Sequence, residues 1–373
     1  MAPINTCVLG TGLSGLTFQI PFVLALPDLF TLHSVLERNP SSEGGRVKER
    51  FGVTTKIHRS LEDVLADSEI ELVIVGTPNA THFEYAKRAL GAGKHVLVEK
   101  PVVTTVAEAR ELGELAKSKN LVLYAYQNRR WDSDFLAVKR LLREPTSSHN
   151  SLGDLVEFES HFDRYRMSVK GTWKDENLPG AGQLFDLGTH LLDQIVSIFG
   201  RPGSVTGFVE NIRGVGHPEV DDTFSVILRY PTSESRKYPL NVLARAHIVS
   251  ARNPQLRYVI RGTKGTLIKY GLDVQEDQLK AIVTPQDIFA EDFGKEPEST
   301  WAELDTIDDS GNITKQRWPT TEAGSYVELF KNLAEAIRED KEPAVKWSEV
   351  TNVIEIIEAA RKSSKGGRTV NLV

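Results

Sequence analysis

The chain has 373 residues, more than one hydrophobic core usually holds, so two domains are expected. Its formal net charge is −6 at pH 7 and it has no basic run, which argues against a nucleic-acid partner. No apolar segment is long enough to suggest a membrane partner. The only cysteine, Cys7, cannot form an intrachain disulfide and favours a reducing compartment, so we expect a cytoplasmic protein.

The first 126 residues alternate strand-like and helix-like segments. Apolar runs typical of buried strands lie at 4–10, 31–37, 70–78, 95–101 and 121–126, and helix patterns lie before Leu26 and at 60–67, 82–93 and 105–120. Ser60 followed by Asp63 is a helix-start signal. Continuous apolar strands that alternate with helices are typical of a parallel sheet covered on both faces. We therefore predict an α/β, doubly wound domain over residues 1–126.

The pattern changes after Tyr126. Residues 143–153 have a loop composition, and the segments 154–165, 222–231 and 241–249 alternate apolar and polar residues. Residues 127–373 are therefore predicted to form an α+β domain with a large, mostly antiparallel sheet. Residues 285–320 are acidic and irregular and indicate a surface insertion, and 325–340 and 347–364 are predicted helices.

A glycine-rich motif, Gly10-Thr11-Gly12-Leu13-Ser14-Gly15, directly follows the first predicted strand and opens the first predicted helix. In a dinucleotide-binding loop, the first glycine makes the turn, the second lets a pyrophosphate approach the backbone, and the third lets helix pack on strand. The motif alone is a weak signal, but this strand–loop–helix context is the one that the function requires. The first domain is therefore predicted to be a Rossmann domain.

Glu37 ends the second predicted strand at the distance from the glycines expected of a ribose-binding acid. Its carboxylate can accept the ribose 2′-hydroxyl of NAD and would repel a 2′-phosphate. Arg38 follows and can bind that phosphate, or it can be a solvated charge at a strand end. From the residues alone the choice between NAD and NADP stays open.

Three more groups of residues are predicted near the nicotinamide end of the same crevice. Glu99-Lys100-Pro101 ends a buried parallel strand, where ligands bind in open α/β sheets. The segment 76–82, GTPNATH, ends another strand, although a proline-stopped strand followed by a capped helix explains it equally well. The segment 126–131, YQNRRW, lies at the domain junction, where its side chains can contact a polyol, the nicotinamide or surface carboxylates.

The segment 186–194, DLGTHLLDQ, places two carboxylates and an imidazole on one stripe of a predicted helix, because Asp186, His190 and Asp193 are four and then three residues apart. They can be metal ligands, an acid–base set or a structural polar face. No cysteine or further histidine cluster completes a metal site, so we predict no metal.

These motifs together identify a family. The set GTGLSG, GTPN, VEKP, QNRRWDSDF and DLGTHLLDQ resembles the Gfo/Idh/MocA oxidoreductases, which include glucose–fructose oxidoreductase and inositol dehydrogenase. The segments FESHFDRYR, EVDDTFSVILRYP and RGTKGTLIKYGLDVQEDQL are similar to the subgroup of NADP-dependent scyllo-inositol dehydrogenases. GAGQLFDLG departs from the wider family, in which three glycines often precede the aspartate.

The resemblance implies an NAD(P)-dependent dehydrogenase or reductase that acts on a secondary alcohol of a polyol, inositol or sugar. His190 would exchange the hydroxyl proton, Lys100 would stabilise the reacting oxygen, and Asp186 would orient the substrate and His190. Asp193 would be a structural partner. The predicted substrate contacts are Lys100, Arg129, Trp131, Arg164, Tyr165, Asp186 and His190. The predicted cofactor contacts are Gly10, Thr11, Gly12, Leu13, Ser14, Gly15, Glu37, Arg38, Thr77, Pro78, Asn79, His82, Glu99, Lys100 and Asn128.

The resemblance also favours NADP over NAD and implies a homodimer or homotetramer formed through the C-terminal sheet. Two alternatives for the function stay open. The same site can serve a reductase of a carbonyl sugar or an enzyme of dihydrodiol type, because hydride transfer runs in either direction. Other members of this fold are non-catalytic sensors of sugars or dinucleotides, and the presence of both Lys100 and His190 argues against that alternative.

Overall fold

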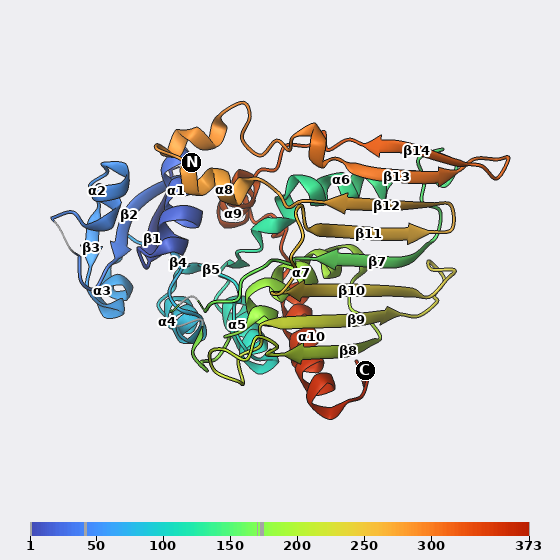
Figure 1. Ribbon diagram of the computed structural model, residues 1–373. Helices are drawn as coiled ribbons and strands as arrows, with labels where there is room; N and C mark the ends of the chain where they lie inside the picture. The colour runs from blue at the N-terminus through green and yellow to red at the C-terminus, as the bar shows by residue number, and fades with distance from the viewer. Residues whose placement is uncertain (1, 41–42, 170, 172–174, 373) are drawn as a thin grey trace. The chain divides into compact units, whose positions relative to one another are not determined.

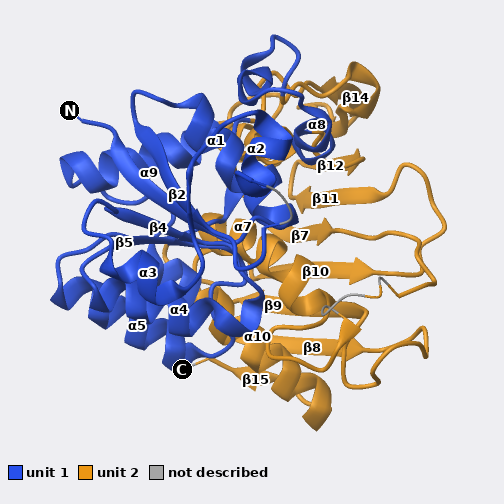
Figure 2. Cartoon of the chain, turned by 90° about the vertical axis from the view of Figure 1, so that its left-hand side faces the viewer, with its two compact units in different colours: residues 1–128, 275–293, 325–351 blue, residues 129–274, 294–324, 352–373 orange. Residues whose placement is uncertain are grey.

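The computed structural model describes residues 2–40, 43–169, 171 and 175–372, and it divides into two compact units (Figures 1 and 2). The first unit comprises residues 1–128, 275–293 and 325–351, and the second comprises residues 129–274, 294–324 and 352–373. The sequence predicts one boundary after residue 126. The first break between the units falls after residue 128, and two later segments of the chain return to the first unit.

The first unit contains a six-stranded parallel sheet with the order β3-β2-β1-β4-β5-β6. The strands are β1 (Ile4–Leu9), β2 (Phe30–Leu36), β3 (Lys56–His58), β4 (Leu72–Val75), β5 (His95–Val98) and β6 (Leu123–Ala125). The chain moves outward from β1 in one direction and from β4 in the other, so the strand order reverses between these two strands. Ligands of doubly wound sheets bind at this point, beyond the carboxyl ends of the strands. The predicted Rossmann fold is confirmed.

The helices of the first unit lie in the connections between its strands and in the two later segments that return to it. They are α1 (Ile20–Ala25), α2 (Gly45–Phe51), α3 (Leu61–Ala66), α4 (His82–Gly91), α5 (Val106–Ser118), α8 (Gln275–Ala281), α9 (Val327–Glu339) and the start of α10 (Trp347–Gly366). Phe330 of α9 stacks on Phe22 of α1 with ring centroids 4.9 Å apart, and this contact secures the returning segment. Ser60 and Asp63 form the predicted capping box of α3.

The second unit contains a nine-stranded sheet with the order β14-β13-β12-β11-β7-β10-β9-β8-β15. The strands are β7 (Leu155–His161), β8 (Ser204–Glu210), β9 (Thr223–Tyr230), β10 (Leu240–His247), β11 (Leu256–Gly262), β12 (Gly265–Tyr270), β13 (Ala302–Ile307), β14 (Ile313–Trp318) and β15 (Val370–Asn371). In the part of the chain that the structure describes, β7 and β10 pair in parallel and the other neighbours pair antiparallel. The predicted, mostly antiparallel sheet is confirmed.

One face of this sheet packs on α6 (Ser133–Leu141), α7 (Thr189–Phe199) and the later part of α10 (Figure 1). The alternate residues of β10 that point to this face are buried, whereas their neighbours are more exposed. At Gly207 on β8 a Cβ atom would lie 2.5 Å from the carbonyl oxygen of Ala360 in α10, so helix and strand are in close contact there. No helix of the described ranges has the length and apolar character needed to cross a bilayer.

Two predictions for the second half of the chain need correction. The predicted surface insertion at 285–320 is wrong over 302–318, because these residues form β13 and β14. β14 lies at the end of the sheet and buries only Trp318 among its side chains, which leaves little apolar alternation for a strand prediction. Helix α6 was not expected, although Phe135, Val138 and Leu141 recur at helical spacing on its buried side.

Candidate active site

The glycine-rich loop leaves the end of β1 and turns at Gly10, whose φ of +99° favours glycine. A Cβ atom on Gly15 would lie 2.0 Å from the carbonyl oxygen of Gly10, so the loop closes only with glycine at this position. A Cβ atom on Gly12 would meet no protein atom within 4 Å. The backbone at Gly12 therefore borders open space, as the close approach of a pyrophosphate requires.

The helix after this loop begins with a π-turn, Gly15–Gln19, and continues as α1. A π-turn inserts a residue into a helix and is frequent at functional sites. Here it directs the buried side chain of Gln19 toward Glu99 at the end of β5, and the two polar atoms lie 2.5 Å apart. Ser14 also donates its hydroxyl to Glu99, at 2.7 Å.

Glu37 stands at the carboxyl end of β2, where a ribose-binding acid is expected. Its Oε2 accepts the backbone N–H of Arg46 at 3.1 Å, and glycine at residue 45 leaves room for the carboxylate. Its Oε1 is buried and accepts no hydrogen bond from the described residues. Arg38 is exposed. Thus the carboxylate is turned toward α2, with one oxygen left as an acceptor, and Arg38 reaches solvent beside it.

Arg46 also contacts the glycine-rich loop, a feature that the sequence analysis did not find. Its guanidinium donates to the carbonyl oxygen of Thr11 at 3.3 Å, while its own backbone N–H binds Glu37. The side chain thus places a positive charge between the phosphate-binding loop and the expected ribose position. Because Arg46 lies beyond the usual fingerprint, spacing alone gave no signal for it.

The loop after β4 carries Thr77, Pro78 and Asn79 and is joined to the loop after β5 by His82. One ring nitrogen of His82 lies 2.7 Å from the carbonyl oxygen of Thr77, and the other lies 2.8 Å from that of Pro101. The ring is 1% exposed, and burial lowers its pKa. His82 therefore links the two loops. Its contact with the cofactor stays a prediction.

Lys100 follows Glu99 directly at the carboxyl end of β5, before a cis peptide to Pro101. Its backbone N–H donates to Oε2 of Glu99 at 3.1 Å. Asn128 ends the first of the three segments that form the first unit. It is buried, and its Oδ1 accepts no hydrogen bond from the described residues. Together with the open space over Gly12 and the unpaired Oε1 of Glu37, this amide fits a nicotinamide dinucleotide, which needs polar partners along its length.

In the second unit, the predicted catalytic segment begins with another π-turn, Leu184–Gly188, which runs into α7. Asp221 accepts the backbone N–H of Leu184 at 2.8 Å and so caps this turn. A Cβ atom on Gly182 would lie 2.2 Å from the same carboxylate, which explains the second glycine of GAGQLFDLG. Burial raises the pKa of Asp221 to about 6. Sequence analysis did not select Asp221.

Asp186 is half-buried in the π-turn, and His190 follows it in the first turn of α7 with 6% of its surface exposed. Asp193, one turn further, is 1% exposed and forms two parallel hydrogen bonds with Arg130, of 2.8 and 2.7 Å. Such a bidentate pair fixes both partners in one geometry. This arrangement agrees with the expected structural role of Asp193.

Gln194 anchors the same helix to the sheet. It donates to the carbonyl oxygen of Arg129 at 2.6 Å and accepts from Arg257 at 2.9 Å. Arg257 is 1% exposed and also donates to Asp134 of α6 at 2.8 Å. Loss of either partner of such a buried ion pair would destabilise the fold, because the other charge would be left buried and unpaired. The partners are far apart in the sequence, so spacing could not reveal them.

The other predicted substrate residues of the second unit differ in exposure. The guanidinium groups of Arg129 and Arg164 lie 5.0 and 5.7 Å from the ring centroid of Phe162. Arg164 donates to Gln183, which precedes the π-turn, at 3.2 Å. Trp131 is half-buried and Tyr165 is 60% exposed. Their contact with substrate stays a prediction. Among the described residues, no three histidine, cysteine or carboxylate side chains are placed to hold a metal ion.

The fold and the glycine-rich loop define the first unit as a dinucleotide-binding domain, and comparison with known proteins identifies the family. Residues 4–127 match the NAD-binding Rossmann domain of the Gfo/Idh/MocA oxidoreductases. Residues 148–372 match the C-terminal α/β domain of the same family. The chain belongs to the Gfo/Idh/MocA oxidoreductase family.

Similar proteins cover the full length of the chain. A protein of Schizosaccharomyces pombe, described only as an uncharacterized oxidoreductase, is 41% identical over 100% of both chains. The scyllo-inositol 2-dehydrogenase (NADP(+)) of Bacillus subtilis is 37% identical over 99% of this chain and 96% of that one. The solved structure of the Bacillus subtilis oxidoreductase YvaA has a TM-score of 0.89 at 34% identity and covers 100% of this chain and 99% of that one.

Proposed function

We propose that this oxidoreductase transfers a hydride between the nicotinamide of NAD(P) and a secondary alcohol carbon of a polyol, inositol or sugar. The proposal assigns the glycine-rich loop, Glu37 and Asn128 to the dinucleotide. It assigns Lys100, Asp186 and His190 to the reacting alcohol. The inositol dehydrogenase among the similar proteins supports the substrate class.

Oxidation of an alcohol needs a base for the hydroxyl proton while the hydride leaves the carbon. His190 accepts that proton, since a neutral imidazole near pH 7 is a suitable base. Lys100 donates a hydrogen bond to the substrate oxygen and stabilises its negative charge. Asp186 binds a substrate hydroxyl and orients the imidazole. The cofactor supplies the hydride acceptor.

The observation that carries the proposal is the division of roles along the polar stripe of α7. Asp193 is bound by Arg130 and Gln194 by Arg257, and these contacts fix the helix that carries His190 one turn earlier. A catalytic base must be held in a defined geometry by such supporting contacts. A structural polar face alone would not need an imidazole on a helix that is held so rigidly.

A screen of turnover with polyols, inositols and aldoses, each with NAD⁺ and NADP⁺, tests the proposal. Formation of the reduced cofactor, followed by absorbance, is expected with at least one alcohol of this class. Ketoses and inosose-type ketones assayed with the reduced cofactor cover the reverse direction. Failure of every compound in both directions would contradict the proposed reaction.

We also propose NADP as the preferred cofactor. The name of the Bacillus subtilis relative specifies NADP(+), and Arg38 is exposed next to Glu37. The carboxylate of Glu37 is held toward α2 by the N–H of Arg46, which limits its repulsion of a 2′-phosphate. Titration of the protein with NADP⁺ and NAD⁺ by calorimetry tests this choice. Tighter binding of NAD⁺ would contradict it.

We further propose that the sheet of the second unit mediates a homodimer or homotetramer. The face opposite to its helices carries a row of apolar side chains that pair across the strands, Ile227 with Leu243 and Val259 with Ile268. Glu159 lies between the two pairs in the same register. An apolar row on a broad sheet face is typical of an interface between subunits.

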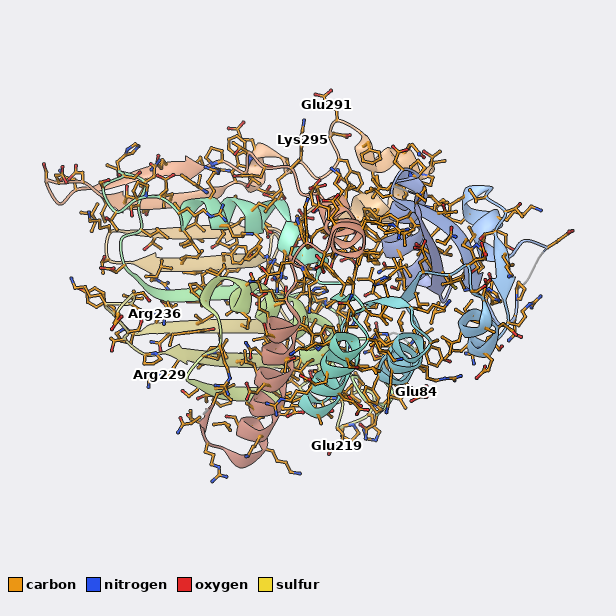
Figure 3. All side chains as sticks on the ribbon, turned by 180° about the vertical axis from the view of Figure 1, so that it is seen from behind. Glu84, Glu219, Arg229, Arg236, Glu291 and Lys295 are labelled. Atoms are coloured by element: carbon orange, nitrogen blue, oxygen red, sulfur yellow. The ribbon has the colours of Figure 1, made fainter. Side chains whose placement is uncertain are left out.

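Light scattering on the purified chain tests this assembly. The wild-type protein should have the mass of a dimer or a tetramer, and Leu243→Glu should lower the mass to that of one chain, because a buried unpaired charge is unfavourable. Glu84→Gln, a change on α4 of the first unit, is the control (Figure 3). A monomeric wild-type protein would contradict the proposal.

A further inference from the structure

Glu99 is a buried carboxylate that joins three parts of the first unit. Its Oε1 accepts hydrogen bonds from the Ser14 hydroxyl at 2.7 Å and from the Gln19 amide at 2.5 Å. Its Oε2 accepts the backbone N–H of Lys100 at 3.1 Å. Only 7% of the residue is exposed. One side chain therefore binds the glycine-rich loop, the π-turn and the peptide of the proposed catalytic lysine.

A negative charge at this position is costly. The site lies beside a loop whose proposed ligand is an anionic pyrophosphate, and burial of a carboxylate is unfavourable unless donors compensate it. The three donors provide that compensation, since hydrogen bonds to an ionised acceptor are among the strongest in proteins. A neutral apolar residue would fill the space without the electrostatic cost, which indicates that Glu99 has a positioning task.

The π-turn makes this arrangement possible. The extra residue in Gly15–Gln19 changes the phase of the helix, and the completely buried amide of Gln19 meets the carboxylate. Ser14 lies in the glycine-rich loop itself, between Gly12 and Gly15. The loop that would bind the pyrophosphate is thus attached through two side chains to the end of β5.

We propose that Glu99 is a positioning residue. It holds the glycine-rich loop and Lys100 in a fixed arrangement, so that the conformation of the loop and the position of Lys100 depend on each other. It acts through Ser14, Gln19 and the Lys100 peptide, in place of the direct cofactor contact that the sequence predicts. The inference rests on the proposed function for the role of Lys100. Its consequence is that dinucleotide affinity and turnover depend on the same buried carboxylate.

A double-mutant cycle with Ser14→Ala and Glu99→Ala tests the coupling. The dissociation constant of NADP⁺ is measured by calorimetry without substrate, and kcat and KM are measured on the best alcohol. Glu99→Ala should weaken NADP⁺ binding about ten- to hundredfold and lower kcat, as loss of charge-assisted hydrogen bonds predicts. Ser14→Ala should weaken binding by itself but add little in the Glu99→Ala background, because the two changes remove the same contact.

If the Glu99→Ala variant does not fold, the Glu99→Gln variant is measured in its place. It retains an acceptor for Ser14 and should restore part of the affinity, whereas the surface variant Glu84→Gln should match the wild type (Figure 3). Additive effects of the two substitutions, or wild-type affinity and kcat in both Glu99 variants, would overturn the inference. A wild-type chain that binds NADP⁺ but turns over no alcohol would contradict the proposed function alone. The dissociation constants of the double-mutant cycle would still measure the coupling between Ser14 and Glu99, because they need no substrate.

Discussion

The two segments of the proposed site, Gly10–Gln19 and Gly182–Asp193, share one construction. Each contains a glycine that a side chain could not replace, each includes a π-turn, and each is held by a buried carboxylate, Glu99 in the first and Asp221 in the second. They differ in what they present. The first offers backbone beside open space at Gly12, and the second offers the side chains of Asp186 and His190.

The difference agrees with the two proposed tasks, pyrophosphate binding and proton transfer. A pyrophosphate is bound by backbone N–H groups at a helix start, so side chains near it must be small. Proton transfer needs a titrating side chain in a fixed orientation, and ion pairs behind α7, such as Arg130 with Asp193, supply that rigidity. Substitutions in the first segment should therefore change dinucleotide affinity, and those in the second should change turnover.

The largest expected effect lies at His190, the proposed proton acceptor. His190→Asn should lower kcat by about 10²–10⁴-fold, the usual contribution of a general base, and leave NADP⁺ affinity within about twofold. His217→Asn, at an exposed histidine of the same unit, is the matched control. Lys100→Met should also lower kcat strongly. Wild-type turnover in both His190→Asn and Lys100→Met would show that these residues do not perform the chemistry.

The next effect concerns Gly12 of the glycine-rich loop. Gly12→Val should abolish dinucleotide binding, because its side chain would occupy the open space where the pyrophosphate is expected. Gly91→Val is a suitable control, since a Cβ atom there also meets no protein atom within 4 Å but the residue ends α4. Calorimetry measures both. Equal affinity of the two variants for NADP⁺ would refute the assignment of the loop.

A smaller effect is expected at Arg38, which should determine the preference for NADP⁺ over NAD⁺. Arg38→Ala should weaken NADP⁺ binding about ten- to hundredfold and leave NAD⁺ binding almost unchanged, because only NADP⁺ carries the 2′-phosphate. Titrations with the two cofactors give the ratio directly. An equal loss for both cofactors would mean that Glu37 determines the pocket and that Arg38 acts only as a surface charge.

The last effect is on stability alone and concerns Asp221, the carboxylate that holds the second π-turn. The folded-state pKa of Asp221 is about 6, above the ordinary value near 4, so the native state binds its proton more tightly than the unfolded chain. The free energy of unfolding should therefore fall as pH rises from about 4 to about 6, by about 3 kcal/mol at most.

Asp221→Asn should remove this part of the pH dependence, measured by urea unfolding at pH 4, 5, 6 and 7. The variant with the exposed Asp309 changed to Asn should retain it. A pH dependence of Asp221→Asn that matches the wild type across this range would show that the carboxyl group titrates normally in the folded protein.

The sequence predicts those features that depend on neighbours along the chain. Continuous apolar strands and the glycine spacing indicate the parallel sheet and the loop after β1, and both are present. The π-turns could not be predicted, because one inserted residue does not change apolar periodicity over five positions. The return of residues 275–293 and 325–351 to the first unit could not be predicted either.

The supporting contacts of the site depend on residues that are distant in the sequence. Arg257 meets Asp134 across 123 positions, and Asp221 meets Leu184 across 37. No spacing rule connects such partners. The sequence thus predicts which side chains carry chemistry, whereas the residues that hold them in place are visible only in the fold.

Transfer of a labelled hydride is the most direct test of the proposed reaction. The purified chain is incubated with NADP⁺ and with each active polyol or inositol deuterated at its secondary carbons, and the cofactor is analysed by mass spectrometry. The wild-type protein should form reduced cofactor that carries one deuterium per turnover, and His190→Asn should form almost none. Reduced cofactor without deuterium, or labelled cofactor formed equally well by His190→Asn, would contradict the proposed reaction.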